Sequence, residues 1–155
     1  MKPILILYAS QTGTAEELAK DINEQLNDQD LKTVYHDVYD CEISILKNYP
    51  ICLLLASTWG EGEPPDDAEE FYNNLDNEKD LDLSQLQFAV FGLGDSAYDE
   101  FNECGKNFDR MLAERGAQRL LPRVDCDIDI DGPFEKWSGQ LIHAIQTQRS
   151  LTASV

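Results

Sequence analysis

The chain has 155 residues, of which 42% are hydrophobic and 27% are charged, a composition typical of a single globular domain and unlike that of a disordered segment. Twelve basic residues against thirty acidic ones give a formal net charge of −18, which disfavours binding to nucleic acid or to an anionic membrane and favours basic protein partners. We expect no signal peptide and no membrane span, because no apolar run is long enough.

Four cysteines, Cys41, Cys52, Cys104 and Cys126, are widely spaced and form no C-x-x-C pair. This spacing favours reduced, partly buried thiols over disulfides or a metal site. We therefore expect a cytoplasmic protein.

Two hydrophobic periods alternate along the chain. Continuous apolar runs such as ILILYA and ICLLLA are typical of strands that are buried on both faces of a sheet. Strands are predicted at 3–9, 31–38, 50–57, 86–93 and 119–124.

Helices are predicted between these strands. In the first of them, Ala15, Leu18, Ala19, Ile22 and Leu26 form one apolar stripe. The predicted helices cover 14–26, 66–75, 102–115 and 134–147, with a short helical turn at 43–47. Gly116 is a typical residue for ending the third of these helices.

Alternating strands and helices predict an α/β fold with a parallel sheet. We expect a three-layer sandwich with a five-stranded, doubly wound sheet of order 2-1-3-4-5, in a domain that covers 1–148 and leaves 149–155 as a tail. Ligands of such sheets bind past the carboxyl ends of the strands, at the switch point between strands 1 and 3. The loops after the first, third and fourth strands are therefore the candidate site.

The first of these loops, Ser10-Gln11-Thr12-Gly13-Thr14, opens a helix and contains no basic residue. Backbone N–H groups at a helix start, with three hydroxyls, can bind one phosphate, although simple helix capping explains the same residue types. The loop has neither the Walker A pattern nor G-x-G-x-x-G, so a triphosphate with magnesium is not expected.

The other two loops each carry glycines and an aromatic residue. Trp59 follows the third strand in STWGEGEPP, and Tyr98 follows the fourth strand in GLGDSAYDEFN. Each could be an ordinary packing or surface residue. Because both leave neighbouring strands at the edge of the phosphate loop, however, they predict a slot for a flat ring that carries a monophosphate.

Taken together, SQTGT, STWGEGEPP and GLGDSAY resemble the three FMN-binding loops of flavodoxins of the short-chain type, and the similarity covers nearly the whole chain. GEGEPP and the later RLLPRVDCD are most similar to the FMN domain of the sulfite reductase flavoprotein and of other diflavin reductases.

This resemblance implies a role for each loop. The first would bind the FMN phosphate, Trp59 and Tyr98 would flank the isoalloxazine, and the Gly60 carbonyl could turn toward flavin N5. The cofactor-binding positions are Ser10, Gln11, Thr12, Gly13, Thr14, Ala15, Ser57, Thr58, Trp59, Gly60, Glu61, Gly62, Leu93, Gly94, Asp95, Tyr98, Phe101, Asn102 and Asp127.

The implied function is that of a monomeric FMN-containing one-electron carrier, which receives electrons from a basic NAD(P)H-dependent flavoprotein reductase and passes them to a redox acceptor protein. No catalytic residue is assigned, because His36 and His143 both suit structural or exposed positions. Ten acidic residues in 61–82, with Asp95, Asp99, Glu100 and Glu103, favour docking to such a partner, although charge runs often serve only solubility.

Four other interpretations of these residues are possible. DIDIDG at 127–132 resembles the start of a calcium loop, but its twelfth position is Ser138 and no metal is expected. A response-regulator receiver would need acids where Ser10 and Ser57 stand. A small FMN-dependent quinone reductase would need longer loops over the ring. The FMN domain of a diflavin reductase remains an alternative to a separate carrier.

Overall fold

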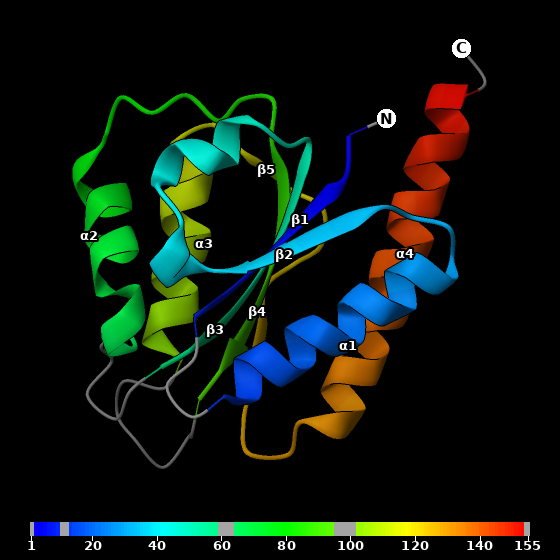
Figure 1. The fold of residues 1–155 in the computed structure, drawn as a ribbon, viewed down its shortest axis with the longest axis horizontal. Helices are drawn as coiled ribbons and strands as arrows, with labels where there is room; N and C mark the ends of the chain where they lie inside the picture. The colour runs from blue at the N-terminus through cyan, green and yellow to red at the C-terminus, as the bar shows by residue number, and fades with distance from the viewer. Residues whose placement is uncertain (1, 10–12, 59–63, 95–101, 154–155) are drawn as a thin grey trace.

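The computed structural model describes residues 2–9, 13–58, 64–94 and 102–153, and the order of its elements follows the predicted alternation (Figure 1). Its strands and α-helices are β1 (Ile4–Ala9), α1 (Thr14–Asp28), β2 (Thr33–Asp37), β3 (Ile51–Ser57), α2 (Glu69–Asn77), β4 (Gln87–Leu93), α3 (Glu103–Glu114), β5 (Gln118–Arg119), β6 (Val124–Cys126) and α4 (Asp131–Ala153). Three short 3₁₀ helices are η1 (Val38–Asp40), η2 (Ile43–Lys47) and η3 (Asp66–Ala68).

The strands form one parallel sheet of order β2-β1-β3-β4-β5, which confirms the predicted fold class and order. In the register, Ala9 lies beside Ala56 and Ser57 beside Leu93, so β1, β3 and β4 end at one level. We call this edge of the sheet the carboxyl edge.

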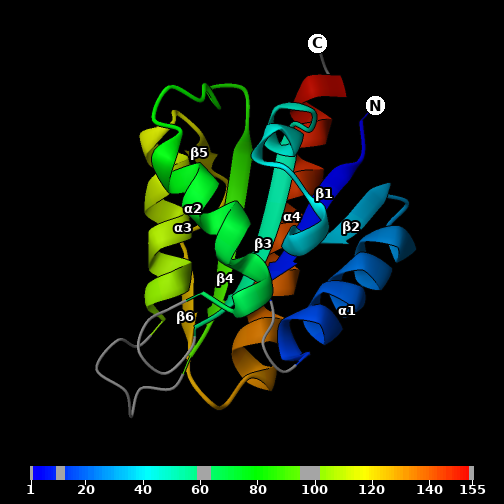
Figure 2. The ribbon, with the colours of Figure 1, turned by 60° about the vertical axis from the view of Figure 1, so that its left-hand side comes forward.

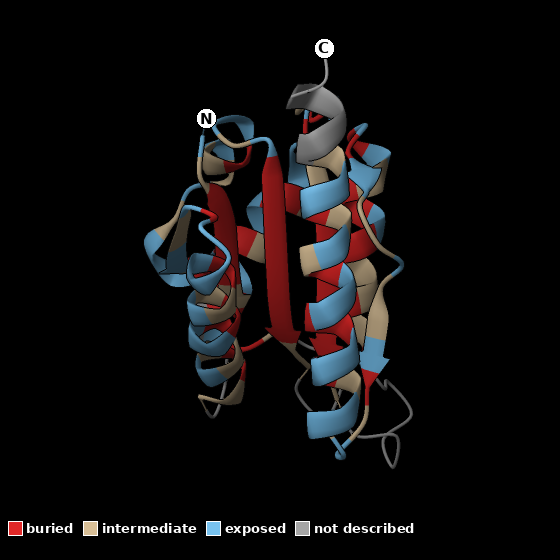
Figure 3. Cartoon of the chain, turned by 90° about the vertical axis from the view of Figure 1, so that its right-hand side faces the viewer, coloured by how far each residue is buried: buried red, intermediate tan, exposed pale blue. Residues whose placement is uncertain are grey.

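The core is divided by the sheet into two clusters. Leu5, Leu54 and Phe88 face α2 and α3, whereas Ile6, Leu53 and Phe91 face α1 and α4. Figure 2 shows the two pairs of helices on opposite sides of the strands, and Figure 3 shows the central strands buried along their length while the helices expose one side. Both faces of the sheet are covered, which explains why the strand sequences are continuously apolar.

The prediction of one continuous strand at 119–124 is wrong, because the structure has two short strands, β5 and β6, there. Arg119 pairs with Phe88 and Val124 pairs with Phe91. The edge segment therefore advances five residues over a stretch in which β4 advances three. The two extra residues loop out of the ladder between β5 and β6, and Pro122 lies in this segment. Proline lacks the N–H that a ladder requires and restricts the residue before it, so the strand breaks here.

Several helix boundaries also differ from the prediction. The helix predicted at 66–75 begins as η3 and becomes α2 only at Glu69, and α4 is longer than 134–147 at both ends. The end of α3 is confirmed: Gly116 adopts φ +94°, and Ala117 N–H donates to the Leu112 carbonyl at 3.2 Å. The predicted turn at 43–47 is η2.

The end of α3 is also joined to the end of α2 by a buried arginine. The Arg115 guanidinium donates to the carbonyls of Leu75 at 2.6 Å, Asp76 at 3.2 Å and Met111 at 3.1 Å. A side chain that satisfies the last carbonyls of two helices holds them at the edge of the sheet opposite the carboxyl edge.

None of the helices in the described part of the chain, α4 included, combines the length and the apolarity that a membrane span requires. The four cysteines, all of them among the described residues, are free thiols, and Cys52, Cys104 and Cys126 are buried while Cys41 is half-buried.

Candidate cofactor site

The three predicted loops leave the sheet at the carboxyl edge from three adjacent strands. β1 connects through α1 to β2 on one side, and the chain then returns to β3 on the other side. This is the switch point at which doubly wound sheets bind ligands. Figures 1 and 2 show α1, α2 and α3 all beginning near this edge.

The first loop region ends at an open helix start. Gly13 adopts φ +91°, and its carbonyl accepts the first helical hydrogen bond, from Glu17 N–H at 3.0 Å. A Cβ built on Gly13 would have no heavy atom within 4 Å. Thr14 and buried Ala15 follow, whereas Ser10, Gln11 and Thr12 lie outside the described residues. The helix start therefore has both the dipole and the space that an anion requires.

The second loop region begins with residues that connect the strands to α3. Thr58 N–H donates to the Leu93 carbonyl at 2.9 Å, and Thr58 Oγ1 accepts from Cys104 N–H at 3.1 Å. The half-buried Ser57 precedes it. Trp59, Gly60, Glu61 and Gly62 lie outside the described residues. Thr58 thus satisfies a backbone donor in the first turn of α3, a task that its sequence position did not indicate.

The third loop region is held at both of its described ends. Gly94 follows buried Leu93, and its N–H donates to the Cys126 carbonyl at 2.9 Å, while Asn102 begins α3. Asp95, Tyr98 and Phe101 lie outside the described residues.

Asn102 is a fully buried polar residue among the predicted site residues that the structure describes. It has no exposed surface, adopts φ +54°, and donates through Nδ2 to Asp125 Oδ1. A Cβ on Gly92 would overlap the Asn102 amide, and one on Gly105 would stand 2.7 Å from Oδ1. Asn102 Oδ1 has no hydrogen-bond partner within the described structure. Two glycines therefore make room for one buried amide.

Asp127 lies beyond β6 on the way to α4, and its carboxylate accepts from Ile128 N–H at 2.8 Å. The acidic run that follows does not gather into a metal site: within the ranges that the structure describes, no group of three or more His, Cys, Asp or Glu side chains could hold an ion. Asp131 of this run belongs to α4.

Four residues that the sequence did not single out individually form a charged cluster behind Asn102. Arg123 donates to Asp125 at 2.7 Å and to the buried Asp109 at 3.2 Å, and Arg119 donates to Asp109 at 2.7 Å. The hydrogen bond with Asp125 raises the pKa of Arg123, and the hydrogen bond with Asp109 raises that of Arg119. The sequence held one signal of this cluster: Asp109 is a charged residue that directly follows Phe108 among the buried positions of α3.

The described residues fit a phosphorylated planar cofactor in three respects. The start of α1 has space beside Gly13, the strand ends converge at the switch point, and the buried Asn102 holds an acceptor that has no hydrogen-bond partner among the described residues. A phosphate bound at the start of α1 and a ring system beside the loops after β3 and β4 would together cover the carboxyl edge.

The model of the family described as flavodoxin matches residues 6–137. This chain belongs to the flavodoxin family. FMN is the cofactor of that family, and the fold and family together make the chain a flavodoxin-type, FMN-binding electron carrier.

Curated relatives point to one kind of flavodoxin domain. The chain is 41% identical over 154 residues to the sulfite reductase [NADPH] flavoprotein alpha-component of Buchnera aphidicola subsp. Schizaphis graminum, covering 99% of this chain and 26% of that protein. It is 41% identical over 136 residues to the protein of the same name from Bacillus subtilis, covering 88% and 22%. The chain thus spans about a quarter of the length of these relatives.

Solved structures give the same fold. The flavodoxin of Streptococcus pneumoniae TIGR4 superposes with a TM-score of 0.83 at 28% identity, covering 95% of this chain and 99% of that one. Oxidised flavodoxin 1 of Bacillus cereus gives 0.80 at 30% identity, covering 92% and 98%.

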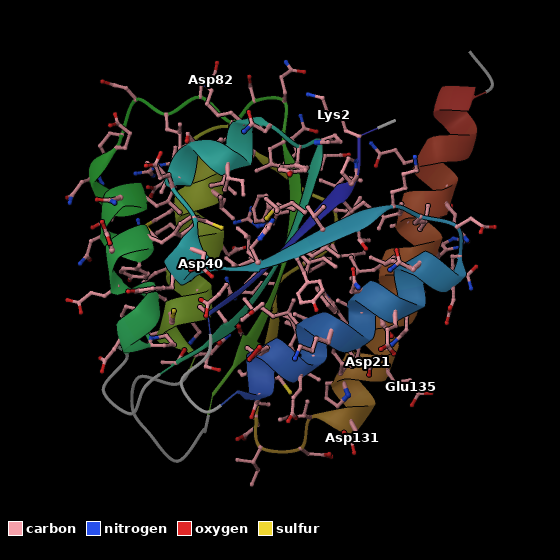
Figure 4. All side chains as sticks on the ribbon, in the orientation of Figure 1. Lys2, Asp21, Asp40, Asp82, Asp131 and Glu135 are labelled. Carbon is pink, nitrogen blue, oxygen red and sulfur yellow. The ribbon has the colours of Figure 1, made fainter. Side chains whose placement is uncertain are left out.

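The acidic run at 61–82 does not stay at the carboxyl edge, which corrects the sequence interpretation. Asp66, Glu69 and Glu70 begin η3 and α2 near this edge, but α2 then carries the chain away from it. In Figure 4, Asp82 and Lys2 both lie at the top of the view, whereas α1 begins near the bottom. The acids from Asp76 to Asp82 are therefore far from the candidate site.

Proposed function

We propose that this chain is an FMN-containing one-electron carrier that takes electrons from an NADPH-dependent flavoprotein reductase and passes them to a redox acceptor protein. The observation that carries the proposal is the meeting of three strand ends and an open helix start at the switch point of a flavodoxin fold. When bound, FMN supplies the redox chemistry, and the protein binds and orients it.

The chain's own residues divide the work of binding. Gly13, Thr14 and Ala15, with Ser10, Gln11 and Thr12, would hold the phosphate through backbone N–H groups and hydroxyls. Trp59 and Tyr98 would flank the ring, and Gly60 would present its carbonyl to the ring edge. Gly94 and Asn102 would support the ribityl side. Ser57, Thr58, Glu61, Gly62, Leu93, Asp95, Phe101 and Asp127 complete the proposed set.

Binding can be tested by titrating FMN with the purified apoprotein and following flavin fluorescence. We expect quenching at a one-to-one stoichiometry. Riboflavin, which lacks the phosphate, should bind at least about tenfold more weakly, because it leaves the start of α1 unused. Equal binding of the two flavins would contradict the phosphate role of α1, and no binding of FMN would contradict the proposal.

A docking face for a basic partner lies beside η1. Tyr39 is 67% exposed, and with Asp66, Glu69, Glu70 and Asn73 it lines a shallow groove of about 340 Å³. An exposed aromatic ring among carboxylates suits a lysine- or arginine-bearing protein surface. Transient encounters of this kind are small and salt-sensitive.

This face can be tested with cytochrome c as a basic acceptor of electrons from the reduced holoprotein. Glu69→Lys should slow the second-order rate several-fold and weaken its dependence on salt. Asp82→Lys, with the same charge change at the opposite edge, is the matched control and should have a smaller effect. Equal effects of the two variants would indicate that only net charge matters.

A second candidate function is that of the FMN module within a longer reductase, which is favoured by the small share of the relatives that the chain covers. A measurement of NADPH oxidation distinguishes an enzyme from both the separate carrier and the FMN module of a longer reductase. The chain alone should not oxidise NADPH, and turnover should require an added NADPH-dependent flavoprotein. Steady turnover by the chain alone would contradict both carrier roles.

A further inference from the structure

The third loop region is anchored at both ends on one short strand. Before it, Gly94 N–H donates to the carbonyl of Cys126, and after it, Asn102 Nδ2 donates to the side chain of Asp125. Asp125 and Cys126 are adjacent residues of β6 and pair with Gly92 and Leu93 of β4. The position of β6 therefore sets where the chain leaves the sheet and where it enters α3.

The Asp125 carboxylate also decides which way the Asn102 amide points. An ionised carboxylate can only accept hydrogen bonds, so the amide must turn its NH₂ group toward Asp125. Oδ1 then lies on the side of Gly92 and Gly105, buried and without a partner among the described residues. A buried, unpartnered acceptor costs free energy, and the charge-assisted bond to Asp125 offsets that cost.

Asp125 is itself fixed by Arg123, whose Nε donates to Asp125 Oδ1 at 2.7 Å and whose Nη2 donates to Asp125 Oδ2 at 3.3 Å. Arg123 is held in turn by Asp109, which is only 3% exposed and belongs to α3. These hydrogen bonds thus link Asp125 of β6 to Asp109 of α3, the helix whose N-cap is Asn102. Asp125 cannot rotate away from Asn102 without losing both bonds to Arg123.

We propose that Asp125 is a positioning residue for FMN, acting through Asn102 to hold the start of α3 and the described ends of the third loop region against β6. This inference rests on the proposed function of the carboxyl edge. It assigns Asp125 no contact with the cofactor.

The test compares Asp125→Asn with Asp129→Asn. Asparagine has nearly the same shape as aspartate but can donate to Asn102 Oδ1, so the amide can invert. Asp129 is exposed, lies four residues further on, and gives the same change in net charge. We expect Asp125→Asn to raise the Kd for FMN about tenfold or more and to change the visible circular dichroism of bound flavin, whereas Asp129→Asn stays within about twofold of wild type.

A double-mutant cycle shows whether Asp125 acts through Asn102. In an Asn102→Ala background, Asp125→Asn should have almost no further effect on the Kd for FMN. Additive effects would overturn the proposal, as would an Asp125→Asn protein that binds FMN like wild type. Wild-type protein that fails to bind FMN would instead overturn the proposed function.

If Asp125→Asn does not fold, as judged by far-ultraviolet circular dichroism, Arg123→Gln carries the same test. It frees the Asp125 carboxylate without removing it and should raise the Kd about threefold to tenfold. Arg110→Gln, which removes a surface pair with Glu114 on the same helix as Asp109, is its matched control and should leave the Kd unchanged. Equal Kd values for these two variants would overturn the proposal.

Discussion

Two helices that begin at the carboxyl edge, α1 and α3, start in the same way and are surrounded differently. Both follow a residue in the left-handed region, Gly13 at φ +91° and Asn102 at φ +54°; Gly13 has no side chain to cap its helix, and the Asn102 side chain makes no capping hydrogen bond to its own. A Cβ on Gly13 would meet nothing, whereas Asn102 is enclosed by Gly92, Gly105 and Asp125.

The difference shows how one edge of a sheet can combine binding with rigidity. The start of α1 has space beside Gly13, and its helix dipole favours a negatively charged ligand there. The enclosed start of α3 fixes the chain on the other side of the same site. Changes around the start of α3 should therefore cost more stability than changes at the start of α1.

The largest effect is expected for Gly92→Ala, because the added methyl would overlap the Asn102 amide in a fully buried space. We expect a loss of about 3 kcal/mol in the free energy of unfolding, measured by urea denaturation of the apoprotein. Gly139→Ala, in α4 with nothing near the added carbon, is the control and should gain about 0.5–1 kcal/mol. An unchanged midpoint for Gly92→Ala would mean that the Asn102 amide moves freely.

Thr58→Val should have the next largest effect. It keeps the shape of the side chain but removes the oxygen that accepts from Cys104 N–H at 3.1 Å. Leaving this buried donor unpaired should cost about 1–2 kcal/mol of unfolding free energy. Thr147→Val on the exposed side of α4 should cost much less. Similar losses for the two variants would argue against this role of Thr58.

Gly13→Ala tests the open helix start. A non-glycine residue at φ +91° is strained, so we expect a loss of about 1 kcal/mol without any steric overlap. Under the proposed function the affinity for FMN should fall as well. Gly13→Asn should recover part of the stability, because asparagine tolerates the left-handed region. A Gly13→Ala protein as stable as wild type would remove the conformational argument.

Thiol labelling changes no residue and should give the smallest perturbation. Burial raises the pKa of Cys104 and raises that of Cys126 to about 11, so little thiolate exists in the folded protein at pH 8. We expect a thiol reagent to label the half-buried Cys41 first, and Cys52, Cys104 and Cys126 only on unfolding. Fast labelling of Cys104 in native buffer would show that the start of α3 opens readily.

The raised pKa values of these thiols also predict how the free energy of unfolding depends on pH. A thiol whose pKa is higher in the folded state stabilises the fold below its ordinary pKa, near 8.5, and that contribution declines as the pH rises toward the folded value. Urea midpoints should therefore fall between about pH 9 and pH 11. Labelling after unfolding should follow the ordinary thiol pKa instead.

Local patterns were enough to predict most elements of the fold, because the buried strands and amphipathic helices each follow one period over many residues. The same patterns could not predict the break between β5 and β6, whose cause is the register against β4 together with Pro122. Nor could they separate the acids of 61–82 into two groups. That separation arises because the nine residues of α2 move the chain about 13 Å from one edge of the sheet toward the other.

The candidate site also has one part that the sequence predicts and another that only the tertiary structure sets. Short motifs were enough to predict which loops would hold a cofactor, because glycines, hydroxyls and aromatic residues at strand ends have a local chemical meaning. Tertiary structure alone decided the partners of Asn102, since Asp125 is 23 positions away and reaches it only when β6 lies beside β4. A sequence thus fixes the chemistry of each side chain, while hydrogen bonds between distant charged groups depend on distances that only the packed fold sets.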